Sequence, residues 1–209
     1  LVIYFSVFAV HLSLLSKPGP GSAFHSQDFL QKNIFEKFTV LNKEMFRANQ
    51  NLKSSHPYSS KWYEWPLMSR AIYYWNNDLG SLPQKIYFIG NPVIWWLSTG
   101  AVVYFLYEII RKKGTISEHY WLLAIGYLLN LLPFIKIGRV MFLYHYLAAL
   151  VFAILILAYI IEKQKNSKKI FGTLLIGSII AFIYFAPLSY GLPLSQKAYE
   201  SSVWLPSWK

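Results

Sequence analysis

The stretch His56–Leu67, HPYSSKWYEWPL, decides how the rest of the chain is interpreted. It holds one His, two Pro, two Tyr, two Trp and one Glu in twelve residues, directly ahead of four long apolar segments. Trp and Tyr collect at the boundary between membrane and water, and they also stack on sugars. The position of the stretch relative to a membrane therefore separates boundary packing from a binding site.

Composition indicates a membrane protein. Of 209 residues, 55% are hydrophobic, 19% aromatic and only 14% charged. The absence of Cys excludes disulfides and thiolate metal sites. The net charge is +11, but many basic residues form short runs beside apolar segments, where they set membrane topology. This location favours a lipid bilayer over nucleic acid as partner, and neither a metal site nor a cofactor is expected.

The apolar segments predict an all-α polytopic membrane protein. Residues 1–16 are short for a full span of about 20 residues, and the chain begins at Leu1 rather than Met. We therefore expect a truncated membrane helix there and a longer parent protein, of which this is the C-terminal piece. Four complete spans are predicted at Pro92–Ile110, His119–Ile135, Val140–Ile161 and Ile170–Leu188.

An amphipathic helix is predicted between the first and second spans. Its apolar positions recur every three or four residues, and Ser26 or Asp28 is available as its N-cap. The stripe comprises Leu30, Ile34, Phe38, Leu41, Met45, Ala48 and Leu52. Such a helix either packs on the protein or lies among lipid headgroups. We favour packing on the protein.

The short loops predict the orientation of the spans. Loop 111–118 carries three basic residues and loop 162–169 carries four, so both are expected on the cytoplasmic side. Alternation then places residues 17–87, the turn at 136–139 and the tail from Ser189 on the extracytoplasmic side. The expected divisions are a truncated helix (1–16), an outer loop with the amphipathic helix and aromatic stretch (17–87), and a four-helix membrane region with an outer tail (88–209).

Phosphate chemistry is expected at the turn between the third and fourth spans. Lys136 offers a point charge and Arg139 a bidentate fork, although both residues also suit ordinary contact with headgroups. Tyr146 lies seven residues after Arg139, on the same helical face. His145 falls on another face and is a candidate either for a site or for buried packing.

The aromatic stretch supplies the remaining candidates. Glu64 is placed to orient an acceptor hydroxyl or to pair with Arg70, and His56 to bind phosphate or sugar. Tyr58, Trp62, Tyr63 and Trp65 form either a sugar-stacking platform or an aromatic belt at the membrane boundary, and the belt is the simpler explanation for most of them.

Five blocks of the sequence together resemble the C-terminal four-span region of the protein O-mannosyltransferases. They are SKPGPGSAFHSQDFLQ (16–31), HPYSSKWYEWPLMSR (56–70), IGNPVIWW (89–96), IKIGRVMFLYHYLAAL (135–150) and FAPLSYGLPLS (185–195). The resemblance implies a type-C glycosyltransferase fold. It also implies transfer of mannose from polyprenyl- or dolichyl-phosphate-mannose to Ser or Thr hydroxyls of exported proteins. The carrier phosphate would then lie beside Lys136 and Arg139, and the aromatic stretch would wall the sugar and acceptor site.

The chain departs from that family in three places. The family's acidic Asp-Glu pair belongs to an outer loop upstream of this sequence, so the catalytic residues are unknown here and the chain alone is expected to be inactive. The loop at 17–87 is too short for the β-rich domain of eukaryotic members, which favours a prokaryotic type in a plasma membrane. Ser22 replaces the family's usual acidic residue after GPG. Transfer of another sugar, and a non-catalytic membrane scaffold, remain alternatives.

Overall fold

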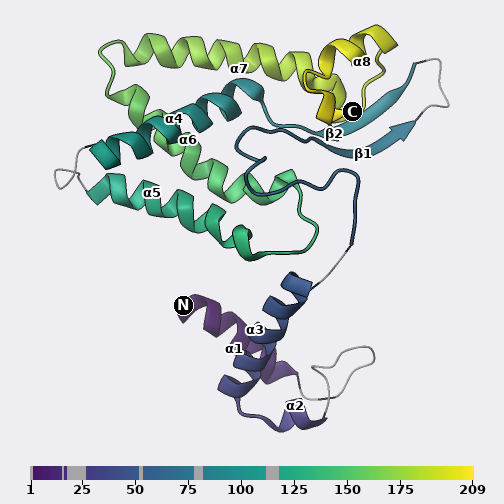
Figure 1. The fold of residues 1–209 in the computed structure, drawn as a ribbon, viewed down its shortest axis with the longest axis vertical. Coiled ribbons are helices and arrows are strands. Elements are labelled where there is room, and N and C mark those ends of the chain that lie inside the picture. Colours follow the sequence, from purple (N-terminus) through teal and green to yellow (C-terminus); the bar gives the residue numbers. More distant parts are fainter. Residues whose placement is uncertain (1, 16, 18–26, 52–53, 78–81, 112–117) are drawn as a thin grey trace. The chain divides into compact units, whose positions relative to one another are not determined.

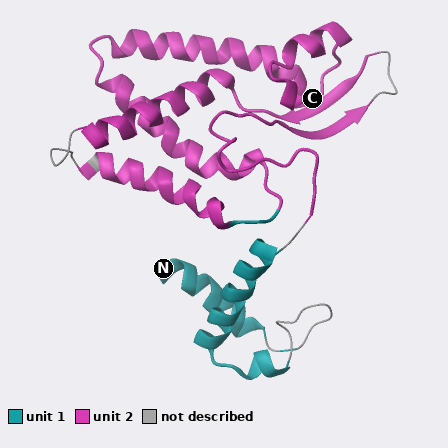
Figure 2. Cartoon of the chain, in the orientation of Figure 1, with its two compact units in different colours: residues 1–53, 137–139 teal, residues 54–136, 140–209 magenta. Residues whose placement is uncertain are grey.

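The computed structural model describes residues 2–15, 17, 27–51, 54–77, 82–111 and 118–209. The chain is mainly helical and includes one two-stranded sheet (Figure 1). It divides into two compact units, one of residues 1–53 with 137–139 and one of residues 54–136 with 140–209 (Figure 2). The predicted divisions at residues 16 and 87 concern membrane sidedness, and they stay predictions.

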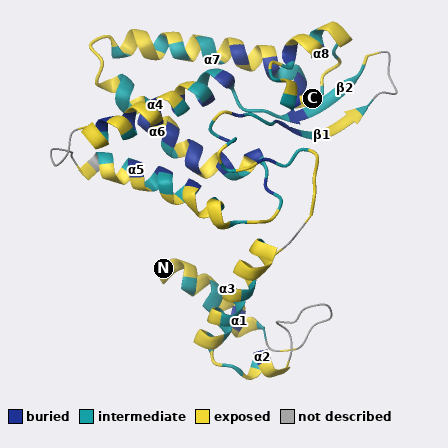
Figure 3. Cartoon of the chain, in the orientation of Figure 1, coloured by how far each residue is buried: buried dark blue, intermediate teal, exposed yellow. Residues whose placement is uncertain are grey.

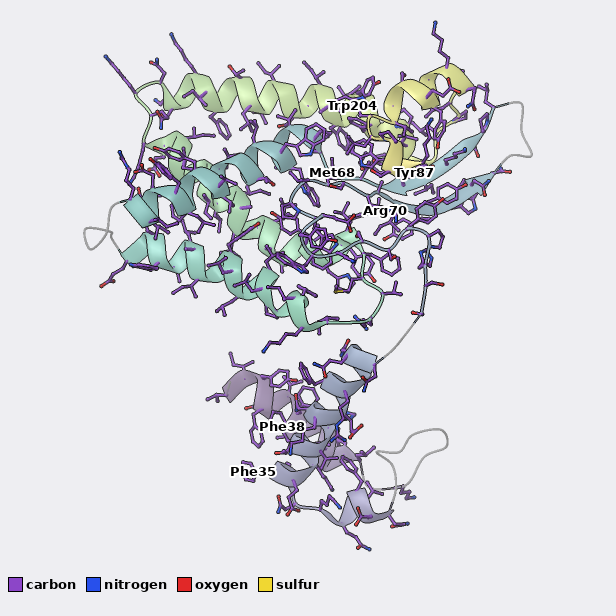
Figure 4. All side chains as sticks on the ribbon, viewed as in Figure 1. Phe35, Phe38, Met68, Arg70, Tyr87 and Trp204 are labelled. Carbon is purple, nitrogen blue, oxygen red and sulfur yellow. The ribbon has the colours of Figure 1, made fainter. Side chains whose placement is uncertain are left out.

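The smaller unit is built on three helices, α1 (Val2–Leu14), α2 (Gln27–Gln31) and α3 (Ile34–Asn51). Aromatic rings join α1 to α3. Phe5 stacks on Phe35 with ring centroids 5.1 Å apart, and the rings of Phe5 and Phe8 meet Phe38 edge to face at 5.1 and 5.7 Å. Figure 4 labels Phe35 and Phe38 on α3. Of the predicted apolar stripe, Phe38 packs on α1, and Phe35, which lies outside that stripe, joins it there.

The predicted N-cap of the amphipathic helix is wrong. Asp28 lies within the separate helix α2, and Ser26 lies outside the described residues. Asn33 caps α3 instead, because its Oδ1 accepts the Glu36 N–H at 3.0 Å while the Asn33 N–H donates to Glu36 Oε2 at 3.1 Å. This reciprocal pair satisfies two backbone donors that a helix start leaves open.

Four helices form the body of the larger unit: α4 (Pro92–Arg111), α5 (Glu118–Leu131), α6 (Leu147–Glu162) and α7 (Ser167–Tyr190). Helix α6 packs against both α4 and α5, and α7 packs against α4. Among the described residues, three stretches are long and apolar enough to cross a membrane, namely Pro92–Arg111, Leu143–Glu162 and Ser167–Tyr190. They correspond to the predicted spans Pro92–Ile110, Val140–Ile161 and Ile170–Leu188, which are the second, fourth and fifth when the truncated helix is counted as the first.

The third predicted span, His119–Ile135, is not α-helical to its end. Helix α5 ends at Leu131, and a 3-10 turn, η2 (Leu132–Lys136), continues it. Pro133 explains the change, because its ring carries no N–H and clashes with the carbonyl four residues earlier. The segment Tyr120–Lys136 is a shorter apolar helix rather than a full span by length. The caps predicted for it, Thr115 and Ser117, lie outside the described residues.

The fourth predicted span does not begin as an α-helix at Val140. A 3-10 turn, η3 (Leu143–Tyr146), leads into α6. Arg139 lies ahead of it in non-helical chain. The predicted common helical face of Arg139 and Tyr146 is therefore wrong, since that argument needs an unbroken α-helix between them.

A β-hairpin lies between the aromatic stretch and α4, where the sequence predicted neither strand. Strands β1 (Ile72–Asn77) and β2 (Gln84–Phe88) are antiparallel, with a register shift between Tyr73 and Trp75 that makes Tyr74 the extra residue of a bulge. Helix α7 packs on β2. After α7 the chain forms α8 (Gln196–Ser202) and a last 3-10 turn, η4 (Pro206–Trp208).

The GNP sequence fixes the start of α4. Asn91 Oδ1 accepts the Val93 N–H at 3.1 Å, and Asn91 Nδ2 donates to the Ser178 carbonyl of α7 at 2.8 Å. Gly90 is needed for close approach, because a Cβ there would lie 2.1 Å from Cε3 of Trp95. One short motif thus caps α4, ties it to α7 and brings the backbone against an indole ring.

Large apolar side chains stay exposed along the membrane-length helices. On α7 they include Ile176, Ile180 and Ile183, each more than 60% exposed. Figure 3 shows exposed residues along the length of α7. A helix with so large an exposed apolar surface suits lipid rather than water.

Candidate functional site

The second half of the aromatic stretch is a turn whose backbone carbonyls accept hydrogen bonds from side chains of α4. Trp95 Nε1 donates to the Trp65 carbonyl at 2.8 Å, and Trp96 Nε1 donates to the Leu67 carbonyl at 2.9 Å. The Thr99 hydroxyl donates to the carbonyl that lies between these two in the chain, that of Pro66. Two indoles and a hydroxyl within five residues of one helix thereby hold three consecutive carbonyls in place.

The turn also closes on itself. Ser69 N–H donates to the Glu64 carbonyl at 3.1 Å, Trp65 Nε1 donates to Ser60 Oγ at 2.9 Å, and Ser60 N–H donates to the Met141 carbonyl at 2.8 Å. The stretch from Ser60 to Ser69 is therefore a fixed loop of the larger unit and not a mobile linker.

Trp65 is completely buried and begins a column of four nearly parallel rings. Its indole stacks on the His145 imidazole at 5.7 Å and 11°, and His145 stacks on Tyr144 at 4.4 Å and 22°. Tyr144 in turn stacks on Phe142 at 5.7 Å and 22°. Tyr144 is 42% exposed, so the column runs from the core to an accessible face.

This geometry corrects the predicted sugar platform. Trp65 cannot stack on a ligand, because neither face of its ring reaches solvent. Trp62 is partly buried and meets the exposed Tyr63 edge to face at 5.7 Å. Tyr144 is the exposed member of the column, but His145 and Phe142 both stack on it, so it presents an edge and a hydroxyl rather than a free ring face. Sequence reasoning named His145 and Tyr146 but not Tyr144, which only the stacking of its neighbours identifies.

His145 and His56 both belong to this aromatic region. His145 Nδ1 lies 3.0 Å from the Phe142 carbonyl and 3.2 Å from its N–H, so a backbone group orients the imidazole. His56 is exposed, accepts the Tyr58 N–H at Nδ1 (3.2 Å) and meets Phe142 edge to face at 5.0 Å. The structure thus brings both predicted His residues into contact with the same Phe.

The predicted carboxylate and guanidinium are placed separately. Glu64 Oε2 accepts the Lys61 N–H at 2.6 Å, and Arg70 Nη1 donates to the Ser59 carbonyl at 3.3 Å. No ion pair joins Glu64 to Arg70 among the pairs found in the described residues. Each side chain instead braces the loop from which it projects, and each is partly exposed.

Phenol rings link the aromatic stretch to the hairpin. Tyr58 contacts Tyr73 at 5.5 Å, Tyr73 contacts Tyr87 across the strands at 5.0 Å, and the Tyr87 and Tyr199 hydroxyls are 2.8 Å apart. Burial, and then the hydrogen bond to Tyr199, raise the pKa of Tyr87 well above its ordinary value. Figure 4 labels Tyr87, which lies on β2, and also Met68 and Arg70, which precede β1. The phenols therefore pack as one array between the aromatic stretch and the hairpin.

The bulge residue Tyr74 lies close enough to Tyr144 to be influenced by it. Burial is the main cause that raises the pKa of Tyr74, and the charge of Tyr144 adds to it. Both residues are exposed, at 57% and 42%. Tyr74 of the hairpin and Tyr144 of the ring column are thus two exposed phenols whose charges interact.

Lys136 lies at one end of an apolar groove on the surface of α5 and η2. The groove holds about 450 Å³ and is lined by Ile125, Leu128, Leu129, Leu132, Pro133, Ile135 and Lys136. Its only charged lining side chain among the described residues is Lys136. Pro133, by turning the helix end into a 3-10 turn, brings that cation to the end of an otherwise hydrocarbon surface.

Arg139 and Tyr146, the other two predicted phosphate ligands, do not line this groove. Arg139 belongs to the smaller unit, where its N–H donates to the Asn49 carbonyl at 3.2 Å and its side chain lines a hollow with Met45 and Ala48. Tyr146 is completely buried in the larger unit, with its hydroxyl 3.1 Å from that of Tyr127. Tyr146 is therefore a packing residue of the helix interior.

The described part of the chain contains no set of side chains that could bind a metal ion. No group of three or more His, Asp or Glu side chains there is arranged to hold a metal ion. The site consists of aromatic rings, one carboxylate, two imidazoles and a few cations.

Known proteins with this sequence pattern and fold are protein mannosyltransferases. The family profile described as the C-terminal four TMM region of protein-O-mannosyltransferase matches residues 34–208. Dolichyl-phosphate-mannose–protein mannosyltransferase 5 of Candida albicans is 30% identical over 86% of this chain and 29% of its own length. The Saccharomyces cerevisiae protein of the same name is 30% identical over 93% of this chain and 28% of its own length.

A solved structure agrees with these relatives. It is the S. cerevisiae protein O-mannosyltransferase Pmt1–Pmt2 complex bound to the sugar donor, with a TM-score of 0.67 and 28% identity over 85% of this chain and 27% of that chain. The chain thus spans under a third of the length of each of these proteins. The fold, the five sequence blocks and the matched profile place this chain in the protein O-mannosyltransferase family, whose C-terminal four-span region it carries.

Proposed function

We propose that this chain forms part of a membrane enzyme that transfers mannose from a polyprenyl- or dolichyl-phosphate carrier to Ser or Thr hydroxyls of exported proteins. The observation that carries the proposal is the apolar groove along α5 that ends at Lys136. Relatives named for the dolichyl-phosphate-mannose donor support it.

The groove matches the chemistry of such a donor. A polyprenyl-phosphate-mannose combines a long hydrocarbon chain with one phosphodiester charge. Hydrocarbon side chains along α5 suit the chain, and an exposed lysine at the end of the groove supplies a point charge for the phosphate. Arg139 stays a predicted phosphate ligand on the strength of its guanidinium fork alone.

The sugar and acceptor side of the proposed site is the accessible face of the aromatic region. Tyr144 offers an exposed ring edge and hydroxyl, and His56, Tyr58, Glu64 and Arg70 offer polar groups that are exposed or half-buried. His145 and Trp65 support Tyr144 from behind. We place this face outside the membrane on the extracytoplasmic side, because the short loops richest in Lys and Arg belong to the cytoplasm. A plasma membrane is the proposed location.

Donor binding tests the proposal in the chain itself. The chain is reconstituted in nanodiscs, and binding of polyprenyl-phosphate-mannose is compared with binding of the uncharged polyprenol. We expect Lys136→Ala to weaken binding of the phosphate-linked lipid about tenfold and to leave polyprenol binding unchanged. Lys168→Ala, at the opposite end of the membrane helices, is the matched control. Equal affinity of both lipids for the parent chain would remove the groove from the mechanism.

Transfer activity tests the acceptor side. In the complete enzyme that contains this chain, His56→Ala and Glu64→Gln are expected to lower mannose transfer to a Ser/Thr peptide. Supplying a polyprenyl-phosphate carrier with another sugar separates a mannosyltransferase from a related transferase. If both variants keep full activity, the aromatic stretch is a membrane-boundary belt and not part of the site.

A further inference from the structure

The C-terminal turn η4 completes the support of the aromatic stretch. Trp208 Nε1 donates to the Met68 carbonyl at 2.8 Å, and the Ser207 hydroxyl donates to the Ser69 carbonyl. Together with the three bonds from α4, these give side-chain donors to five consecutive carbonyls, from Trp65 to Ser69. Donors from two distant parts of the sequence therefore fix one short turn.

Met68 is the residue at which this support matters most. Its φ is +52°, and it is the one residue other than glycine with positive φ in the described part of the chain. The left-handed region is unfavourable for a side chain with a Cβ, so the surroundings must maintain it. Met68 is completely buried, and the Trp208 side chain is only 1% exposed. Water is therefore not available to replace the indole N–H at the Met68 carbonyl.

The direction of the chain at Met68 sets where two proposed site residues project. Glu64 and Arg70 flank the turn, and the Ser69 N–H donates to the Glu64 carbonyl at 3.1 Å across it. If Met68 relaxes to negative φ, the Ser69 N–H turns away and the spacing between Glu64 and Arg70 changes. The tail thus acts on the site through the backbone and not by touching a ligand.

We infer that Trp208 is a positioning residue of the proposed site, which holds Met68 left-handed through its indole N–H and so sets the geometry of Glu64 and Arg70. The inference rests on the proposed function only in that these two residues serve the site. It assigns the C-terminal tail a part in the reaction although no tail residue needs to contact sugar or acceptor.

Hydrogen exchange tests the structural half without any activity. In nanodiscs, the Ser69 and Met68 amides of the parent chain should exchange slowly. Trp208→Phe keeps an aromatic ring but removes the donor, and we expect exchange of residues 64–70 to rise at least tenfold. Gln196→Ala, at an exposed residue of the same tail whose side chain donates to Glu200, should leave it unchanged. Ser207→Ala is a milder second variant if Trp208→Phe does not fold. Unchanged exchange in folded variants overturns the inference.

Kinetics test the positioning half in the complete enzyme. We expect Trp208→Phe to lower kcat about tenfold or more, with little change in KM for the lipid donor, because the donor groove is elsewhere. Gln196→Ala should retain the parent kcat. Altered exchange with unchanged kcat and KM would overturn the role in positioning. Altered exchange together with an inactive parent enzyme would leave the tail contact established and reject the proposed function instead.

Discussion

The indole of Trp65 lies parallel to the imidazole of His145, with 5.7 Å between ring centroids and 11° between ring planes. Trp65 is completely buried, and His145 has the accessible Tyr144 stacked on it as well. The two residues belong to different motifs of the sequence, with α4 and α5 between them along the chain. Their contact joins the aromatic stretch to the turn that leads into α6.

This contact predicts energetic coupling between the two motifs. In a double-mutant cycle of Trp65→Phe and His145→Ala, we expect a coupling free energy of about 0.5–1.5 kcal/mol, the range for stacked aromatic pairs. The measurement is the free energy of unfolding of the four variants in detergent micelles. A parallel cycle with Trp62→Phe, which removes a partly buried indole, should give a coupling near zero. Additive effects of Trp65 and His145 would show that the stacking contributes nothing to stability.

The tight approach at Gly90 predicts a large effect from one methyl group. Gly90→Ala would place its Cβ 2.1 Å from Trp95 Cε3, so the indole that donates to the Trp65 carbonyl must move. We expect destabilisation of about 1–3 kcal/mol. Gly172→Ala is the matched control, since nothing lies within 4 Å of its Cβ position in α7. That helical substitution should be neutral or stabilise by roughly 0.5–1 kcal/mol. Thermal unfolding distinguishes the two variants, and equal melting temperatures would contradict the close approach of Gly90 to Trp95.

How far the sequence predicts this structure depends on the range of the interactions. Long apolar segments carry their own signal, so α4 and α7 lie close to their predicted positions. The hairpin escapes prediction because β1 reads IYYWNN, without the alternation of polar and apolar residues that marks a strand. The hairpin is stabilised by packing of β2 on α7 and by the contact between the rings of Tyr73 and Tyr87.

The candidate site follows the same division. Residue types select this region, whose role stays a prediction. They leave Trp65 between a sugar platform and a boundary belt although it is buried, and they do not name Tyr144. Whether a ring is core or surface depends on contacts between segments far apart in sequence, such as Trp65 with His145. Local periodicity contains no such information. Likewise, the common face predicted for Arg139 and Tyr146 is wrong because the chain is not helical at Arg139.

The phenol pair at the end of the hairpin predicts a loss of stability in alkali. The folded-state pKa of Tyr87 lies above its ordinary value of 10.0, because burial and the bond to Tyr199 favour the neutral phenol. Its stabilising contribution is therefore complete below about pH 10 and is lost as pH rises toward the folded-state pKa, since the unfolded chain releases the proton first. Unfolding followed from about pH 8 to about pH 11, on either side of the ordinary tyrosine pKa, should show a steeper decline for the parent than for Tyr87→Phe. Parallel declines would contradict a shifted Tyr87.

The last prediction concerns a carboxylate inside α4. Arg111 Nη2 contacts Glu108 Oε1 at 2.9 Å, and the Glu108 side chain is only 7% exposed. Arg111→Gln removes that ion pair and leaves a buried carboxylate in an apolar helix, for which we expect a loss of about 1–3 kcal/mol in the free energy of unfolding.

Arg47→Gln is the matched control for this pair. Arg47 pairs with Glu44 at the same spacing of three residues, but Glu44 is 40% exposed, so its loss should cost below about 0.5 kcal/mol. The double variant Glu108→Gln with Arg111→Gln should recover part of the stability lost by Arg111→Gln alone, because no buried charge then remains. If the double variant is instead less stable than Arg111→Gln, the cost lies in lost packing of the side chains and not in the buried charge of Glu108.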